Sequence, residues 1–384
     1  MTVSVTQPLE PVQGSVSLVA VTRAHLLRQF VELPYELYAG DPHWVPPLRR
    51  DEYRRFDPKT NPFLDHADMQ LWVAIDRRGP CGRIAAIEDR AHNTYHRERA
   101  AWFGFFEARS AAIARALLTA AEEWGRARGC VLIRGPANPS LNESAGVLIE
   151  GFDDDPYLLM PYNPPSYAQL IEACGYRKVK DLFAWDLDAS SPLGSRIERL
   201  AGRMRRRHDI TVRRADMKRY FRDLALVTDI YRSAWSDNWG FVPPTDAEMR
   251  QLAVDLKPIV DPDLVLFAET GGKAVGCVVA IPDVNQVLKR MNGNLLPFGL
   301  WHFLNRRRII TRARLALLGV VAEYRHVGLY PLLISEIYRR GVMKGYRRGE
   351  LSWTLEDNTS VNEGIRASGG VLYKRYRVYD KPLG

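Results

Sequence analysis

The stretch Asn138–Glu143 reads NPSLNE, and the stretch Asn358–Glu363 reads NTSVNE. The second phrase begins 358 − 138 = 220 residues after the first. A strand-like run precedes each phrase and ends at its first Asn. The run begins after Gly129 in the first case and after Gly349 in the second. A match of six residues can arise by chance, so its meaning depends on whether the surroundings repeat as well.

The surroundings repeat in the same order. GRIAAIED (82–89) matches GCVVAIPD (276–283), and ACGYRKVKDLFAWD (173–186) matches ASGGVLYKRYRVYD (367–380), both at an offset of 194. PHWVPP (42–47) also matches WGFVPP (239–244). Ordered matches predict a duplicated domain. Because the offset rises from 194 to 220 and falls back, we expect one insertion at about 284–311 and another at about 144–166.

Length and composition limit the classes of protein that fit. A chain of 384 residues has room for two cores of ordinary domain size, and 46% hydrophobic with 26% charged residues is globular. The N-terminus lacks a signal-peptide pattern, and no apolar run is long enough to span a bilayer. The four cysteines have no metal-ligand spacing, so we expect no metal and a cytoplasmic protein. The net charge of +9 favours an anionic partner, and nucleic acid is the least favoured of these.

Each repeat shows the same order of expected elements. Helices come first, then three strands, a long helix, a strand, a short helix and a final hairpin. This α+β order, with a mixed twisted sheet flanked by helices, resembles the GNAT N-acyltransferase fold. The resemblance covers two tandem GNAT domains, at 16–190 and 195–384.

The sharpest motif opens the long helix of the second repeat, where residues 320–330 read VVAEYRHVGLY. This stretch resembles the GNAT acyl-CoA loop, whose pattern is R/Q-x-x-G-x-G/A. A turn between a strand and a helix collects backbone N–H groups at the positive helix end, which suits a pyrophosphate. The resemblance implies that acyl-CoA is bound by Val320, Val321, Arg325, His326, Val327, Gly328, Leu329 and Tyr330. Tyr330 departs from the pattern because it replaces the usual small residue.

The corresponding place in the first repeat reads EARSAAI from Glu107 to Ile113, without a glycine. We therefore expect the first repeat to have lost or altered pyrophosphate binding. In GNAT enzymes the pantetheine lies between two splayed strands, and an Asn after the second strand often binds it or the acceptor. The resemblance gives that role to Asn358. Asn is also a good helix N-cap, and we expect both Asn138 and Asn358 to cap a strand-to-helix turn.

The implied reaction is direct attack of an amine on an acyl thioester, which needs a base and an acid. Glu356 and Asp357 end the second splayed strand and are candidate bases, although a solvated strand end reads the same way. Many relatives place an acidic Tyr two helical turns after the Asn, but this chain has Ile365 there. Tyr373 and Tyr376 are the substitutes.

Two further segments concern the acceptor. The stretch WSDNWGFVPP (235–244) offers Trp235, Asn238, Trp239 and Phe241 as substrate-binding residues, or as ordinary core aromatics. The insertion at 284–311 combines apolar residues with Arg306, Arg307 and Arg308. That combination suits an anionic membrane surface, and a lid over the core is the alternative.

The segments 135–167, 239–244 and 351–382 together are similar to the bacterial tandem GNAT-like family that includes ceramide synthases. This resemblance implies transfer of a long-chain acyl group from acyl-CoA to the amine of a sphingoid base, with peripheral association at the inner membrane face. Two alternatives stay open: an aminoacyl-tRNA-dependent transferase of the Fem type, and a non-catalytic binder of acyl-CoA or acyl-carrier protein. The sequence leaves acyl-CoA and acyl-carrier protein both open as the donor.

Overall fold

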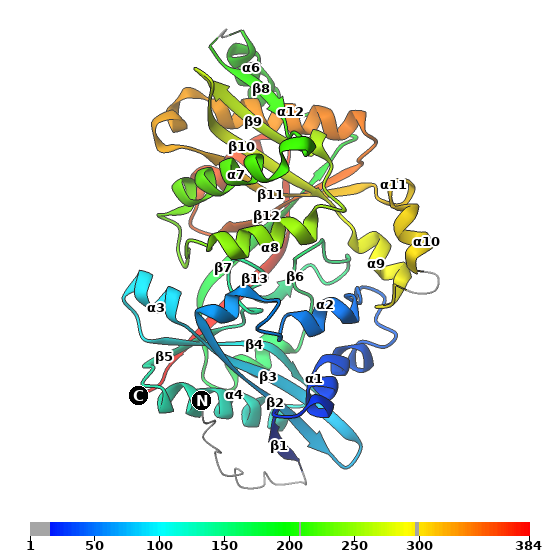
Figure 1. Ribbon diagram of the computed structural model, residues 1–384, viewed down its shortest axis with the longest axis vertical. Helices are drawn as coiled ribbons and strands as arrows, with labels where there is room; N and C mark the ends of the chain where they lie inside the picture. The colour runs from blue at the N-terminus through cyan, green and yellow to red at the C-terminus, as the bar shows by residue number, and fades with distance from the viewer. Residues whose placement is uncertain (1–15, 207–208, 296–298) are drawn as a thin grey trace. The chain divides into compact units, whose positions relative to one another are not determined.

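The computed structural model describes residues 16–206, 209–295 and 299–384, apart from the side chain of His326. The chain divides into two compact units (Figure 1). The first contains the chain up to Phe152, together with Pro161–Lys180 and Tyr376–Gly384. The second contains Asp153–Met160 and Asp181–Arg375.

The first unit has a mixed sheet in the order β1-β2-β3-β4-β5-β13, in which only the pair β4–β5 is parallel. Its strands are β1 (Ser17–Ala20), β2 (Ala67–Asp76), β3 (Gly79–Asp89), β4 (Ala100–Ala108), β5 (Leu132–Gly135) and β6 (Val147–Glu150), with the end of β13 (Val371–Pro382). Its helices are α1 (Ala24–Leu37), α2 (Arg49–Arg54), α3 (Arg90–His96), α4 (Ala111–Ala127) and α5 (Tyr167–Glu172).

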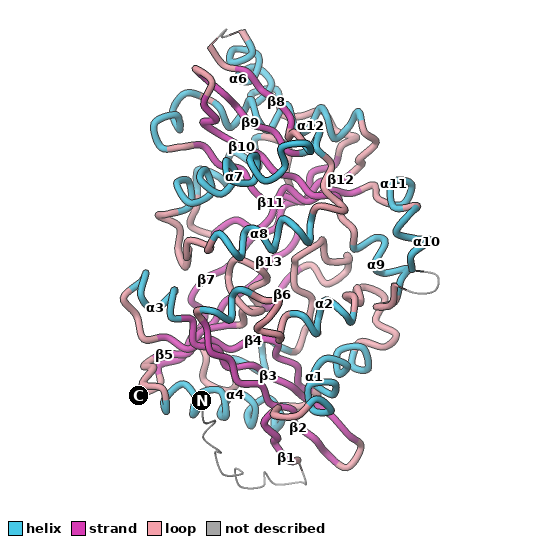
Figure 2. Tube along the Cα trace, viewed as in Figure 1, coloured by secondary structure: helices cyan, strands magenta, loops and turns pink. Residues whose placement is uncertain are grey.

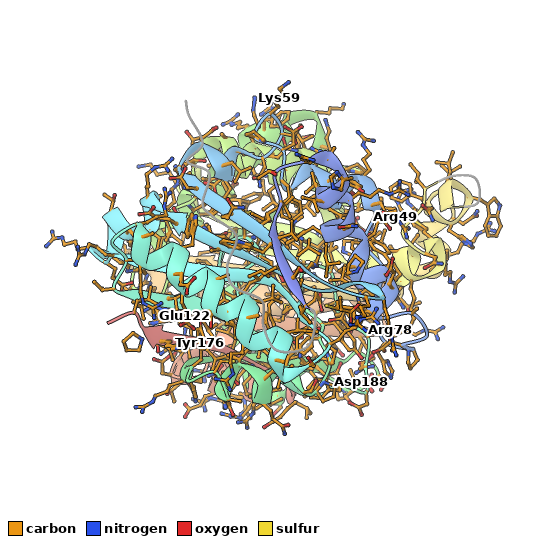
Figure 3. The ribbon with its side chains drawn as sticks, turned by 90° about the horizontal axis from the view of Figure 1, so that it is seen from below. Arg49, Lys59, Arg78, Glu122, Tyr176 and Asp188 are labelled. Atoms are coloured by element: carbon orange, nitrogen blue, oxygen red, sulfur yellow. The ribbon has the colours of Figure 1, made fainter. Side chains whose placement is uncertain are left out.

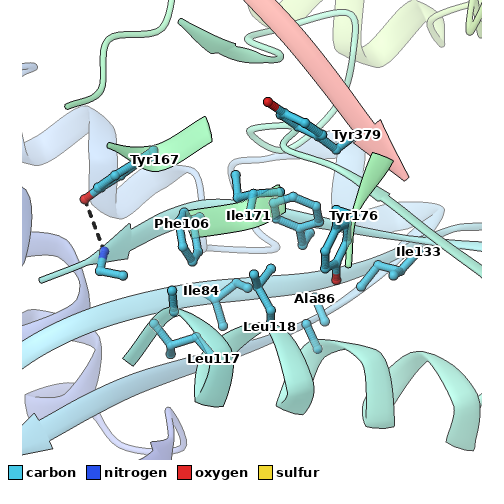
Figure 4. Close-up of a cluster of buried hydrophobic side chains, with 14 of the residues drawn as sticks. Ile84, Ala86, Phe106, Leu117, Leu118, Ile133, Tyr167, Ile171, Tyr176 and Tyr379 are labelled. Atoms are coloured by element: carbon cyan, nitrogen blue, oxygen red, sulfur yellow. Dashed lines mark hydrogen bonds between the residues drawn. The ribbon is translucent and has the colours of Figure 1, made fainter. Parts of the chain in front are cut away.

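The core of the first unit lies between the sheet and α4. Ser110 caps α4 by accepting a hydrogen bond from the Ile113 N–H, and the helix buries Leu117 and Leu118. Figure 4 shows these leucines beside Ile84 of β3. Burial of each such side chain is worth about 1.5–3 kcal/mol, so this face holds α4 in place.

An ion pair joins α4 to the last strand. Glu122 of α4 is 4% exposed and accepts hydrogen bonds from Lys381 at 2.8 and 2.9 Å. Figure 3, which looks at the molecule from below, labels Glu122 along this helix. A buried carboxylate needs such a partner, which is why a charged residue is tolerated here.

The second unit repeats this plan in the order β8-β9-β10-β11-β12-β7, with β11–β12 as the single parallel pair among these. Its strands are β7 (Arg177–Asp188, from 181 onward), β8 (Thr211–Arg214), β9 (Val265–Thr270), β10 (Lys273–Pro282), β11 (Arg312–Val320) and β12 (Arg348–Leu355). Its helices are α6 (Ser195–Arg205), α7 (Tyr220–Trp235), α8 (Asp246–Leu256), α9 (Asn285–Met291), α10 (Gly299–Leu304), α11 (Arg306–Ile309), α12 (Leu329–Met343) and α13 (Thr359–Ala367).

The two sequence echoes 82–89 and 276–283 lie on equivalent strands. β3 pairs with β2 and β4, and β10 pairs with β9 and β11. A Cβ atom at Gly82 would lie 2.5 Å from Ile113 of α4, and one at Gly276 would lie 3.4 Å from Leu333 of α12. In the first repeat this glycine is required for the close approach of the long helix, whereas in the second the long helix lies at an ordinary contact distance from it.

The last strand of each repeat differs from the prediction in two ways. Both β7 and β13 are continuous strands of 12 residues rather than hairpins, because no turn residue interrupts either run. β7 pairs with β12 of the second unit, and β13 pairs with β5 of the first. The compact units therefore do not coincide with the repeats predicted at 16–190 and 195–384.

The described parts of the two predicted insertions also have defined structures. The segment 284–311 contains α9, α10 and α11 (Figure 2), whereas the first repeat has only α3 between the corresponding strands. Within the other insertion, Asp153–Met160 is part of the second unit. This segment is called the strap below.

Candidate functional site

The strands β11 and β12 diverge in the second unit. Their parallel pairing runs from Arg312–Arg348 to Leu315–Leu351, while β11 continues to Val320 and β12 to Leu355. Ala316 is an extra residue in the pairing of β11 with β10, which is a β-bulge. A bulge bends its strand, and the pairing of β11 with β12 ends at this point. Beyond Leu315 the described β11 has no ladder partner on its β12 side.

The equivalent strands of the first unit stay together. They pair as far as Trp102–Arg134, and the Ala137 N–H then donates to the Phe103 carbonyl at 2.9 Å. A Cβ at Gly104 would lie 1.8 Å from the Ala137 carbonyl oxygen. The backbones are thus too close to admit another chain between them.

The twin asparagines have different roles, and the prediction of a cap at both was wrong. Asn358 accepts a hydrogen bond from the Val361 N–H at 3.3 Å and caps α13. Asn138 instead accepts one from the Phe105 N–H at 2.6 Å, and a turn without a helix follows it. Phe105 lies in the bulged part of β4. In the first unit Asn138 therefore bonds the backbone of β4, whereas in the second unit β11 has no ladder partner on its β12 side beyond Leu315.

The expected cofactor loop follows β11. A 3-10 helix (Ala322–Val327) replaces the simple turn expected from the sequence, and Gly328 then adopts a left-handed φ of 92° before α12 begins. Only glycine adopts this conformation without strain. The first two N–H groups of α12, those of Leu329 and Tyr330, have no carbonyl partner within the helix, and Pro331 in the next position has no N–H to satisfy. The loop therefore has the backbone features of an anion site.

Two residues of the expected cofactor set have structural contacts. The guanidinium of Arg325 donates to the carbonyls of Ser233 and Ala234, each at 3.4 Å, at the end of α7. The N–H of Val321 donates to the Val275 carbonyl at 3.0 Å. Arg325 thus joins the loop to α7, and Val321 fixes where the loop leaves the sheet. Val320 is fully buried in the core, Val327 is half-buried, and the His326 side chain lies outside the described part.

The predicted acceptor residues surround the end of α7. Trp235 lies against β11, because a Cβ at Gly319 would be 2.7 Å from its ring. Its ring also contacts Tyr231, which packs edge-on against the buried Phe241. The Asn238 N–H donates to the Trp235 carbonyl at 2.9 Å, and Trp239 is half-buried. Trp235 and Phe241 thus belong to one aromatic group, joined through Tyr231, and Trp235 brings this group against the end of β11.

The predicted bases at the end of β12 lie in different surroundings. Glu356 is half-buried, and its carboxylate accepts a hydrogen bond from the Asp181 N–H at 3.0 Å. Asp357 is exposed. Tyr376 is fully buried and belongs to the first unit.

A polar group lies where β11 and β12 diverge, and its central residue, Glu350, was not singled out from the sequence. Glu350, which pairs with Arg314 across the two strands, is fully buried. Its carboxylate accepts hydrogen bonds from the Ser352 hydroxyl at 2.5 Å and from the half-buried Tyr373. The guanidinium of Arg314 lies 3.9 Å away. The signal was present in GELSWTL (349–355), where Glu350 and Ser352 interrupt an apolar central strand at alternate positions.

Arg314 and Glu350 lie on the same face of the sheet as α7. Leu315 and Leu351, the neighbours of Arg314 and Glu350, pack toward Ile334 of α12. Successive side chains of a strand point to opposite faces, so Arg314 and Glu350 point the other way. That face is the one on which Leu317, beyond the bulge, packs near Ile230 of α7.

The strap is built into the second unit by buried polar groups. Asn285 donates to the Pro156 carbonyl at 2.8 Å, and the Leu158 N–H donates to Asp283 at 3.0 Å. The Leu158 carbonyl accepts from Arg314 at 3.0 Å. Lys374, 1% exposed, donates to the carbonyls of Asp154 and Asp155 at 2.8 and 2.9 Å. The strap therefore shares Arg314 with the polar group around Glu350.

Burial changes the titration of these groups. It raises the pKa of Asp283 to about 6, against the lowering effect of Arg312 at 2.8 Å. It lowers the pKa of Lys374, although Glu350 acts in the opposite direction. The guanidinium carbon of Arg312 lies over the Tyr157 ring of the strap, 4.4 Å from the centre of the ring. For the pKa values of Asp283 and Lys374, burial outweighs the neighbouring charges because it removes water from the charged form.

The structure also bears on metals and membranes. Among the described residues no group of three or more His, Cys, Asp or Glu side chains could hold a metal ion. None of the helices described is long and apolar enough to cross a bilayer.

Comparison with known proteins identifies first the class and then the family. A tandem GNAT protein from the clavulanic acid biosynthesis pathway aligns with a TM-score of 0.58 at 14% identity, over 96% of this chain and 99% of that one. The glucosamine N-acetyltransferase region of a fungal β-N-acetylglucosaminidase aligns with a TM-score of 0.57, also at 14% identity, over 98% of this chain and 39% of that one. The predicted tandem GNAT fold is therefore confirmed.

The sequence comparison is more specific. The chain is 37% identical over 386 residues to a bacterial ceramide synthase of Caulobacter vibrioides (strain NA1000 / CB15N), covering 98% of this chain and all of that one. It is also 33% identical to Protein YghO of Escherichia coli (strain K12), over 93% of both chains. No family model matches the chain. The chain belongs to the family of the bacterial ceramide synthase and is an N-acyltransferase of tandem GNAT fold.

Proposed function

We propose that this chain transfers a long-chain acyl group from acyl-CoA to the amine of a sphingoid base. The observation that carries the proposal is the divergence of β11 and β12 next to the Gly328 loop, in the second unit alone of the two. The name of the Caulobacter relative supports the acceptor class.

The donor would lie along β11. Its pyrophosphate would meet the loop Arg325–Tyr330 and the first turn of α12, where helix geometry leaves N–H groups available. Its pantetheine would follow β11 past Leu315, taking the place of a strand. The backbone N–H groups of β11 around the bulged Ala316 would stabilise the negative oxygen that forms on the thioester carbonyl. Asn358 stays a candidate contact of the pantetheine or the acceptor, in addition to its capping role.

The acceptor would approach from the α7 face. Trp235, Asn238, Trp239 and Phe241 lie at the end of that helix, and their aromatic character suits a long-chain amine. Arg325 holds this helix end to the cofactor loop. Binding of the donor and the shape of the acceptor pocket would therefore be linked.

The direct test is release of CoA thiol from palmitoyl-CoA by the purified chain, with and without sphinganine, and with mass spectrometry of the lipid product. We expect an N-acyl sphinganine in equal amount to the released thiol. Sphinganine-dependent release with acyl-carrier protein alone would change the donor. Binding of acyl-CoA without any release would favour the non-catalytic binder, and transfer from an aminoacyl-tRNA would favour the Fem type.

We also propose that the insertion α9–α11 docks on an anionic membrane surface to collect the lipid acceptor. In α10, Trp301 and Leu304 are 62% and 67% exposed, and the exposed Arg307 and Arg308 follow in α11. Arg306 instead donates to the Pro258 carbonyl at 3.0 Å. Two exposed arginines near an anionic surface contribute about 2 kcal/mol. A nearby cleft of about 270 Å³ is lined by charged residues such as Lys289 and Arg312, so it does not suit an acyl chain.

Flotation with phosphatidylglycerol vesicles tests this docking. The change Arg307→Glu with Arg308→Glu should abolish flotation and leave acyl-CoA affinity near normal. The matched control is Arg77→Glu with Arg78→Glu, an exposed arginine pair at the tip of the β2–β3 hairpin; Figure 3 labels Arg78. Flotation that survives the first change, or that both changes reduce equally, would assign the insertion another role.

A further inference from the structure

The site contains a buried carboxylate that sequence reasoning did not assign. Removing an ionised carboxylate from water is costly unless hydrogen bonds and charges compensate it. Glu350 has such compensation, with the Ser352 hydroxyl at 2.5 Å, the Tyr373 hydroxyl, and the Arg314 guanidinium at 3.9 Å. Three groups from three strands, β11, β12 and β13, therefore converge on a single side chain.

Hydrogen bonds fix the orientations of both Arg314 and Glu350. Arg314 donates to the Ser352 hydroxyl at 2.8 Å, to the Ser352 carbonyl at 3.2 Å and to the Leu158 carbonyl of the strap at 3.0 Å. Glu350 in turn receives the hydroxyl protons of Ser352 and Tyr373. A phenol has one proton to donate and can accept through its oxygen. With its proton directed to Glu350, the oxygen of Tyr373 acts as an acceptor.

The position of the pair fits the reacting atoms of the proposed transfer. Glu350 lies one residue before the last paired residue of β12, where a thioester running along β11 would end. The pair lies on the α7 face, from which the acceptor would come. Tyr373 is half-buried, whereas Glu350 is fully buried, so a substrate would meet Tyr373 first.

We propose that Tyr373 and Glu350 form a proton relay that serves as both the base and the acid of the N-acyl transfer. Tyr373 is the catalytic residue, and Glu350 is a positioning residue that acts through it. This inference rests on the proposed function. It replaces the separate roles expected for Glu356 and Asp357, whose side chains respectively bond the backbone of Asp181 and lie exposed.

The steps balance without a further reactant. The amine nitrogen attacks the thioester carbonyl carbon and forms the C–N bond, and one N–H proton passes to the Tyr373 oxygen as the Tyr373 proton passes to Glu350. The C–S bond then breaks, the CoA thiolate takes a proton from Tyr373, and Tyr373 regains its proton from Glu350. One amide and one thiol result, and the relay returns to its first state.

The test compares Tyr373→Phe, Glu350→Gln and the double variant in steady-state acyl transfer. Each single change should lower kcat by about a hundredfold or more, because a positioned acid or base contributes that much. The double variant should fall no more than about threefold below the worse single variant, because groups in one relay are lost together. The Kd of palmitoyl-CoA, measured by calorimetry, should stay within about threefold of wild type.

Matched controls are Tyr338→Phe and Glu336→Gln in α12. Tyr338 donates to the Ala189 carbonyl at 3.3 Å, and the buried Glu336 pairs with Arg205 at 2.9 Å. Both variants should keep at least half of wild-type kcat. If Tyr373→Phe retains more than a third of wild-type kcat, or if the two single losses multiply in the double variant, the relay is overturned.

A folding defect in a variant can be distinguished from loss of the relay. If Glu350→Gln fails to fold, as judged by its thermal transition, Tyr373→Phe decides alone, because its half-buried ring is retained. Loss of acyl-CoA affinity in both variants with kcat unchanged would show a purely structural role and overturn the relay. Failure of the proposed function is separate, because wild type itself would then release no CoA with a long-chain amine.

Discussion

The backbone of Gly328 allows a sharp test of the cofactor loop. Its φ is 92°, and a Cβ there would lie 3.4 Å from the Met204 sulfur, an ordinary contact. The cost of Gly328→Ala is therefore backbone strain rather than collision, about 1–2 kcal/mol for an L-residue in this region. For a unit of this size that corresponds to a fall in Tm on the order of 2–8 °C.

Gly345 provides the matched control at the other end of α12. Its φ is 86°, and no atom lies within 4 Å of the Cβ position, so Gly345→Ala should cost the same free energy of unfolding. Gly345 is far along the helix from the loop, so acyl-CoA affinity should not change. The comparison separates general destabilisation from local loss of the anion site.

The change Gly328→Glu adds a charge to the same strain. Two like charges about 6 Å apart repel by roughly 3 kcal/mol at an effective dielectric constant of about 20. The Kd of CoA, measured by calorimetry, should rise by about a hundredfold in this variant. If Gly328→Glu binds CoA as wild type does, while Gly345→Ala lowers Tm as expected, the assignment of the loop is refuted.

Three further predictions concern individual side chains. Burial raises the folded-state pKa of Asp283 from 3.8 to about 6, so between these pH values the folded state binds a proton that the unfolded state lacks, and the free energy of unfolding falls as the pH rises from about 4 to 6. Asp283→Asn should reduce this fall by about 3 kcal/mol, measured by urea melts at about pH 4 and pH 6, and an unaltered fall would contradict the raised pKa. Asn358→Ala removes the cap of α13 and should cost about 1 kcal/mol of unfolding free energy, and a stability equal to wild type would show that the cap does not contribute. Asn138→Ala should destabilise the first unit by about 1–3 kcal/mol, because it leaves the Phe105 N–H unpaired, and should leave acyl-CoA affinity unchanged; a lower affinity would place the cofactor in the first unit.

The features that the sequence predicted well are local or repeated. The duplication follows from ordered matches, and the strands that carry GRIAAIED and GCVVAIPD hold equivalent places in the two sheets. Gly328 precedes a long helix, as the loop pattern implied. The absence of a glycine after Glu107 correctly drew attention to a first repeat that differs from the second. These signals need only neighbouring residues or an internal copy.

The features that the sequence did not reveal depend on distant partners. β7 and β13 have nearly the same pattern, and nothing in either shows that each pairs outside its own repeat. Asn138 and Asn358 occur in the same phrase, yet one bonds a bulge 33 residues earlier and the other caps the next helix. The strap Asp153–Met160 reads as a loop, and its place in the second unit rests on Asn285, Arg314 and Lys374, which lie more than 100 residues away.

Glu350 illustrates the same limit at the site. Its position in an apolar strand was visible, but its partners Arg314 and Tyr373 come from other strands. A charge in a central strand is a reason to look for such partners before assigning the exposed carboxylates nearby. Here that rule would have directed attention from Asp357 to Glu350.

Hydrogen–deuterium exchange with a non-hydrolysable thioether analogue of palmitoyl-CoA tests directly where acyl-CoA binds. We expect the analogue to slow exchange in 315–330 and 350–358 of the second unit and to leave 103–113 and 135–143 of the first unit unchanged. Protection of the first-unit segments instead, or no protection of 315–330 at saturating analogue, would contradict a single acyl-CoA site between β11 and β12.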